Sequence, residues 1–215
     1  MALMFHYLSG SPFAWKVWLA LEHKGAAYDL RVVSRDAGDL TTPAFHALNP
    51  YGKAPVIEHD GFALFESSAI VEYLEEALPG PSLWPASIQD RANARRIMAE
   101  SQTSLYPPVR RLVDALLLNG GAPPDEAVVS AASKDATHCA SILAQSLHAS
   151  FFGGGEPGAA DYSVYPLSAI MARLSTIGAA TRPHLDLPDA FIAWRERMRA
   201  LPIVAATQPP HWRQT

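Results

Sequence analysis

Glu66 and Ser67 stand directly before an apolar helical pattern, in a place where their side chains could bind a ligand. Ser67 is a good N-cap residue, because its hydroxyl can accept a backbone N–H bond. The N–H groups at a helix start favour a carboxylate or phosphate, and Glu66 beside them could bind an ammonium group. The pair predicts a site for the α-amino acid end of a ligand. The alternative is an ordinary capped helix after a surface hairpin.

Ser11, which precedes Pro12, is the second candidate for chemistry. A thiolate held at the start of a helix would feel the helix dipole and a hydrogen bond from Ser11, and both lower a thiol pKa from its usual value of about 8.5. A hydroxyl is too weak a base to deprotonate a thiol, so Ser11 would act as a hydrogen-bond donor. Ser9 is a competing hydroxyl, and we prefer Ser11 because it abuts the proline. The alternative role for Ser11 is an N-cap only.

The first element needed to position these residues is a strand–helix–strand unit. Residues 3–8 are typical of a short buried strand, and the helix that begins near Pro12 should end at Gly25. Residues 28–33 are typical of a second strand. We therefore expect a parallel βαβ unit.

The second element is a hairpin followed by a helix. Residues 55–58 and 62–65 flank Asp60-Gly61, and Asp-Gly between apolar runs favours a type I′ turn. Apolar residues then recur at three- and four-residue spacing until Pro79, which predicts a helix.

Composition excludes several classes of protein. The chain has 215 residues, 49% of them hydrophobic, and a net charge of −4 without a basic block, so nucleic acid is not an expected partner. No apolar run approaches about 20 residues, so we expect no membrane span. The start of the chain lacks a signal-peptide pattern, and Cys139 is the single cysteine, which fits a reducing, cytoplasmic compartment. The eight histidines lack metal-ligand spacing, so no metal is expected.

The remainder of the chain reads as helical. Three prolines between residues 79 and 87 suggest a linker, with a domain boundary near residue 82. Residues 88–118 form a long amphipathic pattern, in which Pro107-Pro108 predicts a kink or break. Further helices are expected over 123–150 and 188–201, and Cys139 should be a buried or half-buried apolar residue.

Three short motifs together carry a resemblance to a known family. They are Ser11-Pro12-Phe13 with Lys16-Val17, Pro55-Val56 before the hairpin, and Glu66-Ser67 after it. This combination resembles serine-type glutathione transferases, including plant tau-class and bacterial members. The resemblance implies a thioredoxin-like α/β domain over residues 1–81 that binds glutathione. It also implies an all-α helical domain over 82–215 that lines the pocket for an electrophile.

The resemblance also implies roles for residues of the glutathione site. Pro55 would follow a cis peptide bond, and Ala54 would pair its backbone with the cysteinyl part of glutathione. Glu66 and Ser67 would hold the γ-glutamyl end, while Ser11 would stabilise the thiolate.

Other residues receive roles by their position in the family pattern. Phe13 is placed at the glutathione site and, with Tyr106 and Arg110, near the electrophile. Lys53 is the best candidate for the glycine carboxylate, because an ammonium group reaches a carboxylate as a point charge. Asp161 matches the acidic end of a helix-starting capping box and is expected to be structural.

The leading hypothesis from the sequence is a glutathione transferase that joins the thiolate of glutathione to a small hydrophobic electrophile. One alternative is a glutathione-binding or scaffold protein without turnover, since fold does not fix function. Another is a glutathione-dependent isomerase, hydrolase or dehalogenase. The family is usually dimeric, so we expect a homodimer, with Tyr51 and the segments 61–78 and 88–105 as candidate interface.

Overall fold

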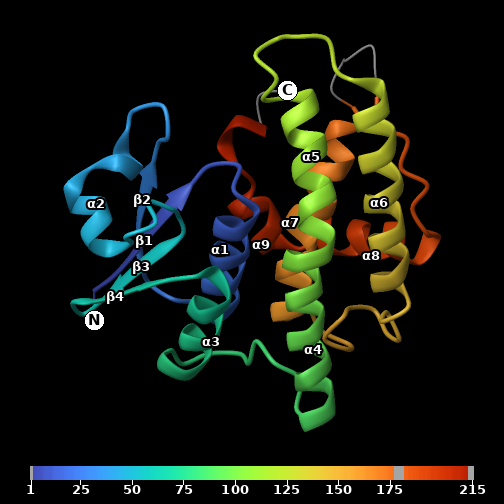
Figure 1. The fold of residues 1–215 in the computed structure, drawn as a ribbon. Coiled ribbons are helices and arrows are strands. Elements are labelled where there is room, and N and C mark those ends of the chain that lie inside the picture. Colours follow the sequence, from blue (N-terminus) through green and yellow to red (C-terminus); the bar gives the residue numbers. More distant parts are fainter. Residues whose placement is uncertain (1, 177–181, 213–215) are drawn as a thin grey trace. The chain divides into compact units, whose positions relative to one another are not determined.

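The computed structural model describes residues 2–176 and 182–212. The chain divides into two compact units. One comprises residues 1–83 together with 200–215, and the other comprises residues 84–199. Figure 1 shows their helices and strands in chain order. The division of roles that we expected between residues 1–81 and 82–215 stays a prediction.

A four-stranded mixed sheet forms the centre of the first unit. Its strands are β1 (Leu3–Leu8), β2 (Asp29–Val33), β3 (Val56–His59) and β4 (Phe62–Phe65), in the order β2-β1-β3-β4. β1 pairs with β2 in parallel, and β3 pairs with β1 and β4 in antiparallel fashion. The predicted βαβ unit and the predicted hairpin are therefore confirmed.

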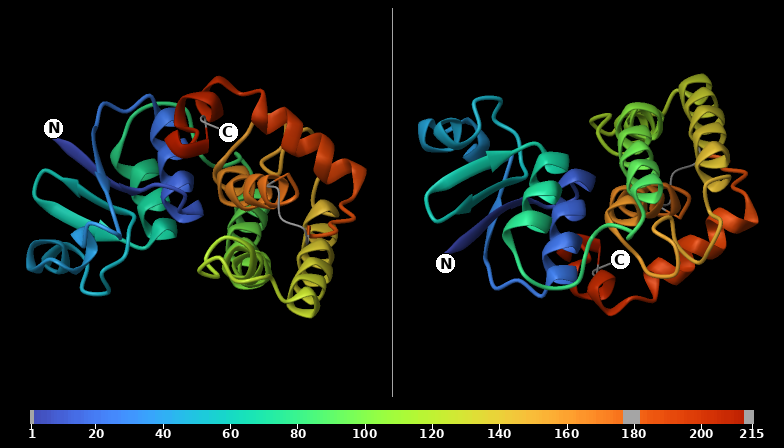
Figure 2. Two further views of the ribbon diagram at one scale, coloured as in Figure 1. Left: turned by 90° about the horizontal axis from the view of Figure 1, so that it is seen from above. Right: turned by 90° about the horizontal axis from the view of Figure 1, so that it is seen from below.

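Helices cover both faces of this sheet. α1 (Pro12–Lys24) and α3 (Ser67–Ala77) pack against each other on one face, and α2 (Pro43–Leu48) lies on the other (Figures 1 and 2). The same unit holds α9 (Pro202–Thr207), which packs on α1, and two short 3-10 helices, η1 (Asp39–Thr41) and η3 (Pro210–Trp212). The core between the sheet and the α1–α3 pair includes the fully buried Phe5, Val17, Ile57 and Ile70.

Two turns of the first unit follow from their sequence. Asp60 and Gly61 have φ values of 50° and 88°, as the central residues of a type I′ turn require. Gly25 ends α1 in the left-handed conformation, with φ 61°.

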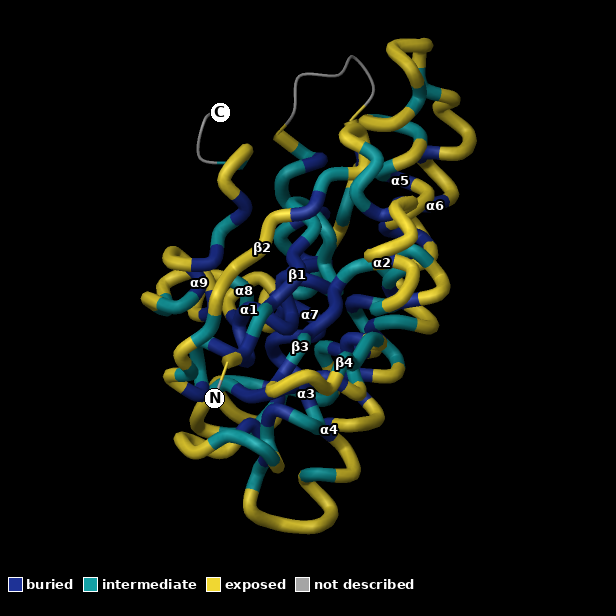
Figure 3. The backbone as a smooth tube through the Cα atoms, turned by 90° about the vertical axis from the view of Figure 1, so that its left-hand side faces the viewer, coloured by how far each residue is buried: buried dark blue, intermediate teal, exposed yellow. Residues whose placement is uncertain are grey.

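The second unit consists of helices. They are α4 (Ile88–Glu100), α5 (Tyr106–Leu116), α6 (Glu126–Ala144), α7 (Ala159–Leu174) and α8 (Asp189–Arg199), with a π-helical segment η2 (Ser101–Leu105) between α4 and α5. α7 contacts α4, α5 and α8 and is buried over most of its length (Figure 3).

The predicted break in the 88–118 pattern exists, but it lies at the π-helical segment η2 and not at the two prolines. Pro107 and Pro108 lie in the first turn of α5, where a missing N–H costs little. The helix predicted over 123–150 is shorter than expected. Asp125 caps the start of α6 at Glu126, and the chain leaves the helix after Ala144 through a series of tight turns.

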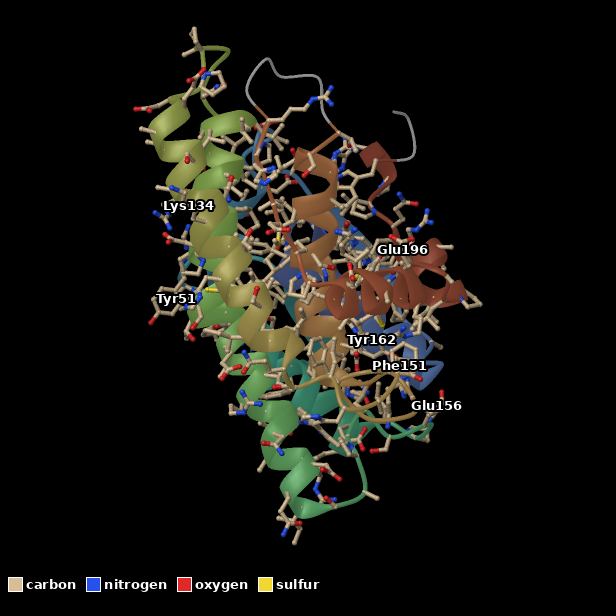
Figure 4. All side chains as sticks on the ribbon, turned by 90° about the vertical axis from the view of Figure 1, so that its right-hand side faces the viewer. Tyr51, Lys134, Phe151, Glu156, Tyr162 and Glu196 are labelled. Atoms are coloured by element: carbon tan, nitrogen blue, oxygen red, sulfur yellow. The ribbon has the colours of Figure 1, made fainter. Side chains whose placement is uncertain are left out.

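Asp161 anchors the start of α7, as expected. It is fully buried and accepts hydrogen bonds from the backbone N–H groups of Phe152, Gly153 and Gly158 and from the indole of Trp194. Figure 4 labels Phe151 and Glu156 in the preceding loop and Tyr162 in the helix that this carboxylate starts.

None of the helices within residues 2–176 and 182–212 combines the length and the apolar character that a membrane crossing would require.

Candidate functional site

The Ala54–Pro55 peptide bond is cis, as the family resemblance implied. The loop before it is held by Asn49, which is only 3% exposed. The Asn49 amide donates to the carbonyl of Lys53 at 2.6 Å and accepts the N–H of Tyr51 at 3.0 Å. Asn49 thereby fixes the backbone that leads into Ala54 and strand β3. We had not assigned it a role from the sequence.

The start of α3 differs from the prediction by one residue. The N-cap is Glu66, with φ 69° and ψ 105°, and Ser67 is the first helical residue. The Ile70 N–H donates to the Glu66 carbonyl at 2.9 Å, which confirms where the helix begins. Our assignment of Ser67 as the N-cap was therefore wrong, because Glu66 has a positive φ outside the helical region and helical geometry begins only at Ser67.

This helix start suits an anion from outside. The exposed Glu66 side chain makes no capping hydrogen bond in the described part of the chain, whereas Ser11 and Asp125 cap their own helices. The first N–H groups of a helix have no partner within the helix, and they attract negative charge. Ser67, which is 5% exposed, lies in this first turn.

Lys16 places a buried amine against the same turn. Its side chain comes from α1, is 1% exposed, and donates from Nζ to the Ser68 hydroxyl at 3.1 Å. Burial lowers the pKa of Lys16 to about 7, and the nearby Glu66 carboxylate opposes that change. Lys16 can thus carry positive charge beneath the α3 start near neutral pH. The sequence signal was a lysine on the apolar side of α1, which is ambiguous because lysines often extend along apolar surfaces to reach solvent.

Ser11 occupies the N-cap of α1. Its hydroxyl oxygen accepts the Ala14 N–H at 3.2 Å, and its carbonyl accepts the Trp15 N–H at 3.0 Å. A serine hydroxyl that accepts a capping bond still has its proton to donate. Ser11 can therefore cap the helix and donate to a ligand atom at the same time, so the two roles weighed from the sequence are compatible.

Ser9 is engaged elsewhere. Its hydroxyl lies 2.9 Å from Nδ1 of His211 and beside the phenol of Tyr7. Burial raises the pKa of Tyr7, and the Ser9 side chain and the Gly10 backbone partly offset that rise. These contacts favour Ser11 over Ser9 as the group that faces a ligand, and the choice between the two stays a prediction.

Comparison with known proteins gives this arrangement a context. Residues 10–77 match the family model described as glutathione S-transferase, N-terminal domain. Glutathione S-transferase A of Pleuronectes platessa is 27% identical over 213 residues, which cover 95% of this chain and 90% of that protein. The crystal structure of a glutathione S-transferase from the Antarctic clam Laternula elliptica superposes with a TM-score of 0.81 at 25% identity, covering all of this chain and 95% of that one.

Over residues 10–77 this chain thus matches the N-terminal domain of glutathione S-transferases, and its fold is that of the solved glutathione S-transferase from Laternula elliptica. The expected fold, a thioredoxin-like α/β unit followed by helices, is thereby confirmed. A maleylacetoacetate isomerase of Mus musculus is 39% identical over 89 residues, which cover 40% of this chain and 41% of that protein. The alignments to the first curated relatives span about two fifths to half of those proteins.

The two remaining expected glutathione contacts, Lys53 and Phe13, also lie in the first unit. Lys53 is exposed on the loop that Asn49 holds, and Phe13 is half-buried in the first turn of α1, two residues after Ser11. Lys53 comes directly before Ala54 in the chain, and Phe13 follows Ser11 by two residues. Their roles stay predictions.

Two of the expected electrophile contacts, Tyr106 and Arg110, lie together on α5 in the second unit. Arg110 is exposed and forms an ion pair with Asp114 at 2.7 Å. The hydrogen bond to Asp114 raises the pKa of Arg110, burial opposes that rise, and Tyr106 adds to it. Tyr106 is half-buried. The pair presents a phenol beside an ion-paired guanidinium, and its role stays a prediction.

Other chemistry has little support in the described residues. Within residues 2–176 and 182–212, no three His, Cys, Asp or Glu side chains gather as a metal site would require. Cys139 is half-buried, its thiol donates to the Ser104 carbonyl at 3.3 Å, and burial, with Asp135, raises its pKa. A raised thiol pKa disfavours the reactive thiolate.

Proposed function

We propose that this protein is a glutathione transferase that conjugates reduced glutathione to a small hydrophobic electrophile. The observation that carries the proposal is the α3 start, where Glu66 leaves the helix uncapped by its own side chain and Lys16 supports the turn from below. A free α-amino acid end has a carboxylate for the N–H groups of this turn and an ammonium group for the exposed Glu66.

The proposed mechanism assigns a task to each residue. Ala54 pairs its backbone with the cysteinyl part of glutathione, beside the cis bond to Pro55. Lys53 binds the glycine carboxylate. The thiol loses its proton to solvent, and Ser11 donates a hydrogen bond to the resulting thiolate. The thiolate sulfur then forms a bond to an electrophilic carbon, and the leaving group departs with its electron pair.

Much of the rate gain comes from a larger thiolate fraction at neutral pH and from positioning of the two reactants. Phe13, Tyr106 and Arg110 are proposed to contact the electrophile. The acceptor is glutathione as co-substrate, and no resident cofactor takes part in these steps.

Replacement of Ser11 by alanine tests the proposal. Loss of one preorganised donor to developing or stored negative charge typically costs about 10²–10³-fold in kcat. We therefore expect Ser11→Ala to lower turnover with a general electrophile by about that factor, with little change in the Kd for glutathione measured by calorimetry. Ser9→Ala, at the competing hydroxyl, should lower turnover much less. Equal turnover of Ser11→Ala and the wild type would exclude the role of Ser11.

A glutathione-dependent isomerase is the second candidate, because five of the relatives with partial alignments are maleylacetoacetate isomerases. The two activities differ in their stoichiometry. A transferase consumes one glutathione for each electrophile, while an isomerase returns glutathione unchanged. Quantifying free glutathione against product over many turnovers decides between them. Saturable binding of glutathione without turnover of any substrate would instead support the non-catalytic binding protein.

We also propose that the protein acts as a cytoplasmic homodimer. Tyr51 is 68% exposed and packs edge-on against Phe65 of β4. A large aromatic side chain left exposed in this way is typical of an interface. Light scattering at micromolar concentration should give twice the monomer mass, and Tyr51→Ala should shift that mass toward the monomer. A wild-type monomer would remove the dimer.

A further inference from the structure

The segment from α9 to η3 belongs to the same compact unit as the sheet and α1. Its anchor is Trp15, in the first turn of α1, which is 2% exposed. The Trp15 indole N–H donates to the Thr207 hydroxyl at 2.9 Å, and its ring meets Trp212 edge-on with centroids 5.4 Å apart. Residues about 190 positions later in the chain therefore satisfy the indole of Trp15. Figure 2 shows α9 beside α1.

His211 extends this contact to the loop between β1 and α1. Its Nδ1 lies 2.9 Å from the Ser9 hydroxyl. Gly10 next to it has φ +82°, and a Cβ there would lie 3.2 Å from Cε1 of His211. The absent side chain of Gly10 thus makes room for the imidazole, and its conformation suits glycine.

These contacts bracket Ser11 on both sides. Ser9 and Gly10 come directly before it, and the Trp15 N–H donates to its carbonyl. The Ser11 N–H donates to the Leu8 carbonyl at 3.1 Å, so the loop is a closed turn. A segment that holds both the turn and the first helical residues restricts where the Ser11 hydroxyl can point.

We infer that Thr207, His211 and Trp212 form a clamp that positions Ser11 toward the glutathione thiolate, with His211 as its link to the serine loop; this role rests on the proposed transferase activity. His211 acts through Ser9 and is a positioning residue. A positioning error of about 1 Å can cost about 100-fold in rate, whereas one neutral hydrogen bond shifts an equilibrium by roughly 2–10-fold. Loss of the His211 bond should therefore reduce the productive orientation of Ser11 by roughly the smaller factor.

The competing explanation is that this segment only covers Trp15 to complete the core. The two explanations predict different effects when these contacts are removed. If the segment is only a cover, the free energy of unfolding falls. If it is a clamp, kcat and the pKa of the bound thiol change while glutathione affinity stays constant.

The decisive variants separate the ring of His211 from its hydrogen bond. His211→Phe keeps a ring over Gly10 and removes the bond, and His211→Asn keeps a polar atom near the position of Nδ1. His138→Phe on the exposed side of α6 is the matched control. We expect His211→Phe to lower kcat roughly 2–10-fold at unchanged KM for glutathione. We also expect it to raise the pKa of the bound thiol, which is measured from the ultraviolet absorbance of the thiolate as a function of pH. His211→Asn should recover part of the loss, and the control should match the wild type.

A double-mutant cycle with Ser9→Ala sharpens the test. If His211 acts through Ser9, the two substitutions together should cost no more than the larger single effect. Unchanged kcat and thiol pKa in His211→Phe, or fully additive losses in the cycle, would overturn the clamp.

Hydrogen exchange keeps this test separate from that of the proposed function. Without any substrate, the amide of Ser11 should exchange faster in His211→Phe than in the wild type, because the loop that the clamp holds opens more often. If the wild type shows no turnover, the transferase proposal fails while faster exchange still supports the clamp. Unchanged exchange at Ser11 would contradict the clamp whatever the activity.

Discussion

The starts of α3 and α7 use the same helix-end electrostatics for opposite purposes. At α7 the chain supplies its own anion, since the fully buried Asp161 gathers three backbone N–H groups and the Trp194 indole at 2.8–3.2 Å. Burial raises the pKa of Asp161, and these four hydrogen bonds oppose that rise. Asp161 therefore ties the preceding loop and Trp194 to the first turn of α7.

At α3 the nearest carboxylate, that of Glu66, is exposed and forms no cap. The charge that the chain does supply there is the buried amine of Lys16, which adds to the positive end of the helix. The carboxylate at the start of α7 belongs to the protein and holds structure together, whereas the start of α3 is the proposed site for the carboxylate of a ligand.

Asp161→Ala should have the largest effect. Asp161→Ala leaves four N–H donors without their partner, and each buried unsatisfied donor typically costs about 1–3 kcal/mol. We expect a loss of that size in the free energy of unfolding, measured in urea. Asp135→Ala is the control, since Asp135 is exposed and pairs with Arg111 on the surface, where substitutions usually change stability by about 0.5 kcal/mol or less. A loss below about 1 kcal/mol for Asp161→Ala would mean that α7 does not depend on this anion.

Ser67→Ala should weaken glutathione binding with little effect on stability. A hydrogen bond to a charged group contributes about 1.5–3 kcal/mol, which corresponds to a rise in Kd of roughly 10-fold or more by calorimetry. Loss of a true N-cap would instead lower stability by about 1 kcal/mol. Unfolding in urea separates the two results. A stability loss at constant Kd would show that α3 is closed by Ser67 in the manner of a cap.

Lys16→Met should change the pH dependence of stability. The folded pKa of Lys16, about 7, lies below its ordinary value near 10.5, so the unfolded state binds more protons between these pH values. Wild-type stability should therefore rise relative to Lys16→Met as pH increases, by about 1 kcal/mol from pH 7 to 8. Paired urea titrations across this range measure the difference. A difference that stays constant would place the Lys16 pKa outside this range.

Local signals predicted the elements of the first unit well. The Asp60-Gly61 turn, the Gly25 helix end and the Pro12 helix start each reflect a backbone preference of the residue itself. The cis bond before Pro55 came from the family resemblance, since no local rule separates a cis from a trans proline.

The details that escaped prediction depend on neighbours distant in sequence. Glutamate seldom adopts a positive φ. The sequence therefore predicts the N-cap of α3 at Ser67, one residue after its position at Glu66 in the structure. Lys16 is an ordinary lysine until α3 packs over it. The bond between Trp15 and Thr207 joins residues 192 positions apart, and no periodicity encodes such a pair.

The contact between Trp15 and Thr207 affects the order in which the protein can fold during its synthesis. Ribosomes add about 5–20 residues per second and domains tend to fold as they emerge, yet Trp15 leaves the ribosome long before Thr207 and Trp212 are made. For roughly ten seconds or more the nascent sheet unit therefore carries an indole that its own residues 1–83 do not cover in the way that the finished structure does. The helical residues 84–199 are made during that interval, so the first unit to begin folding is the last to be completed.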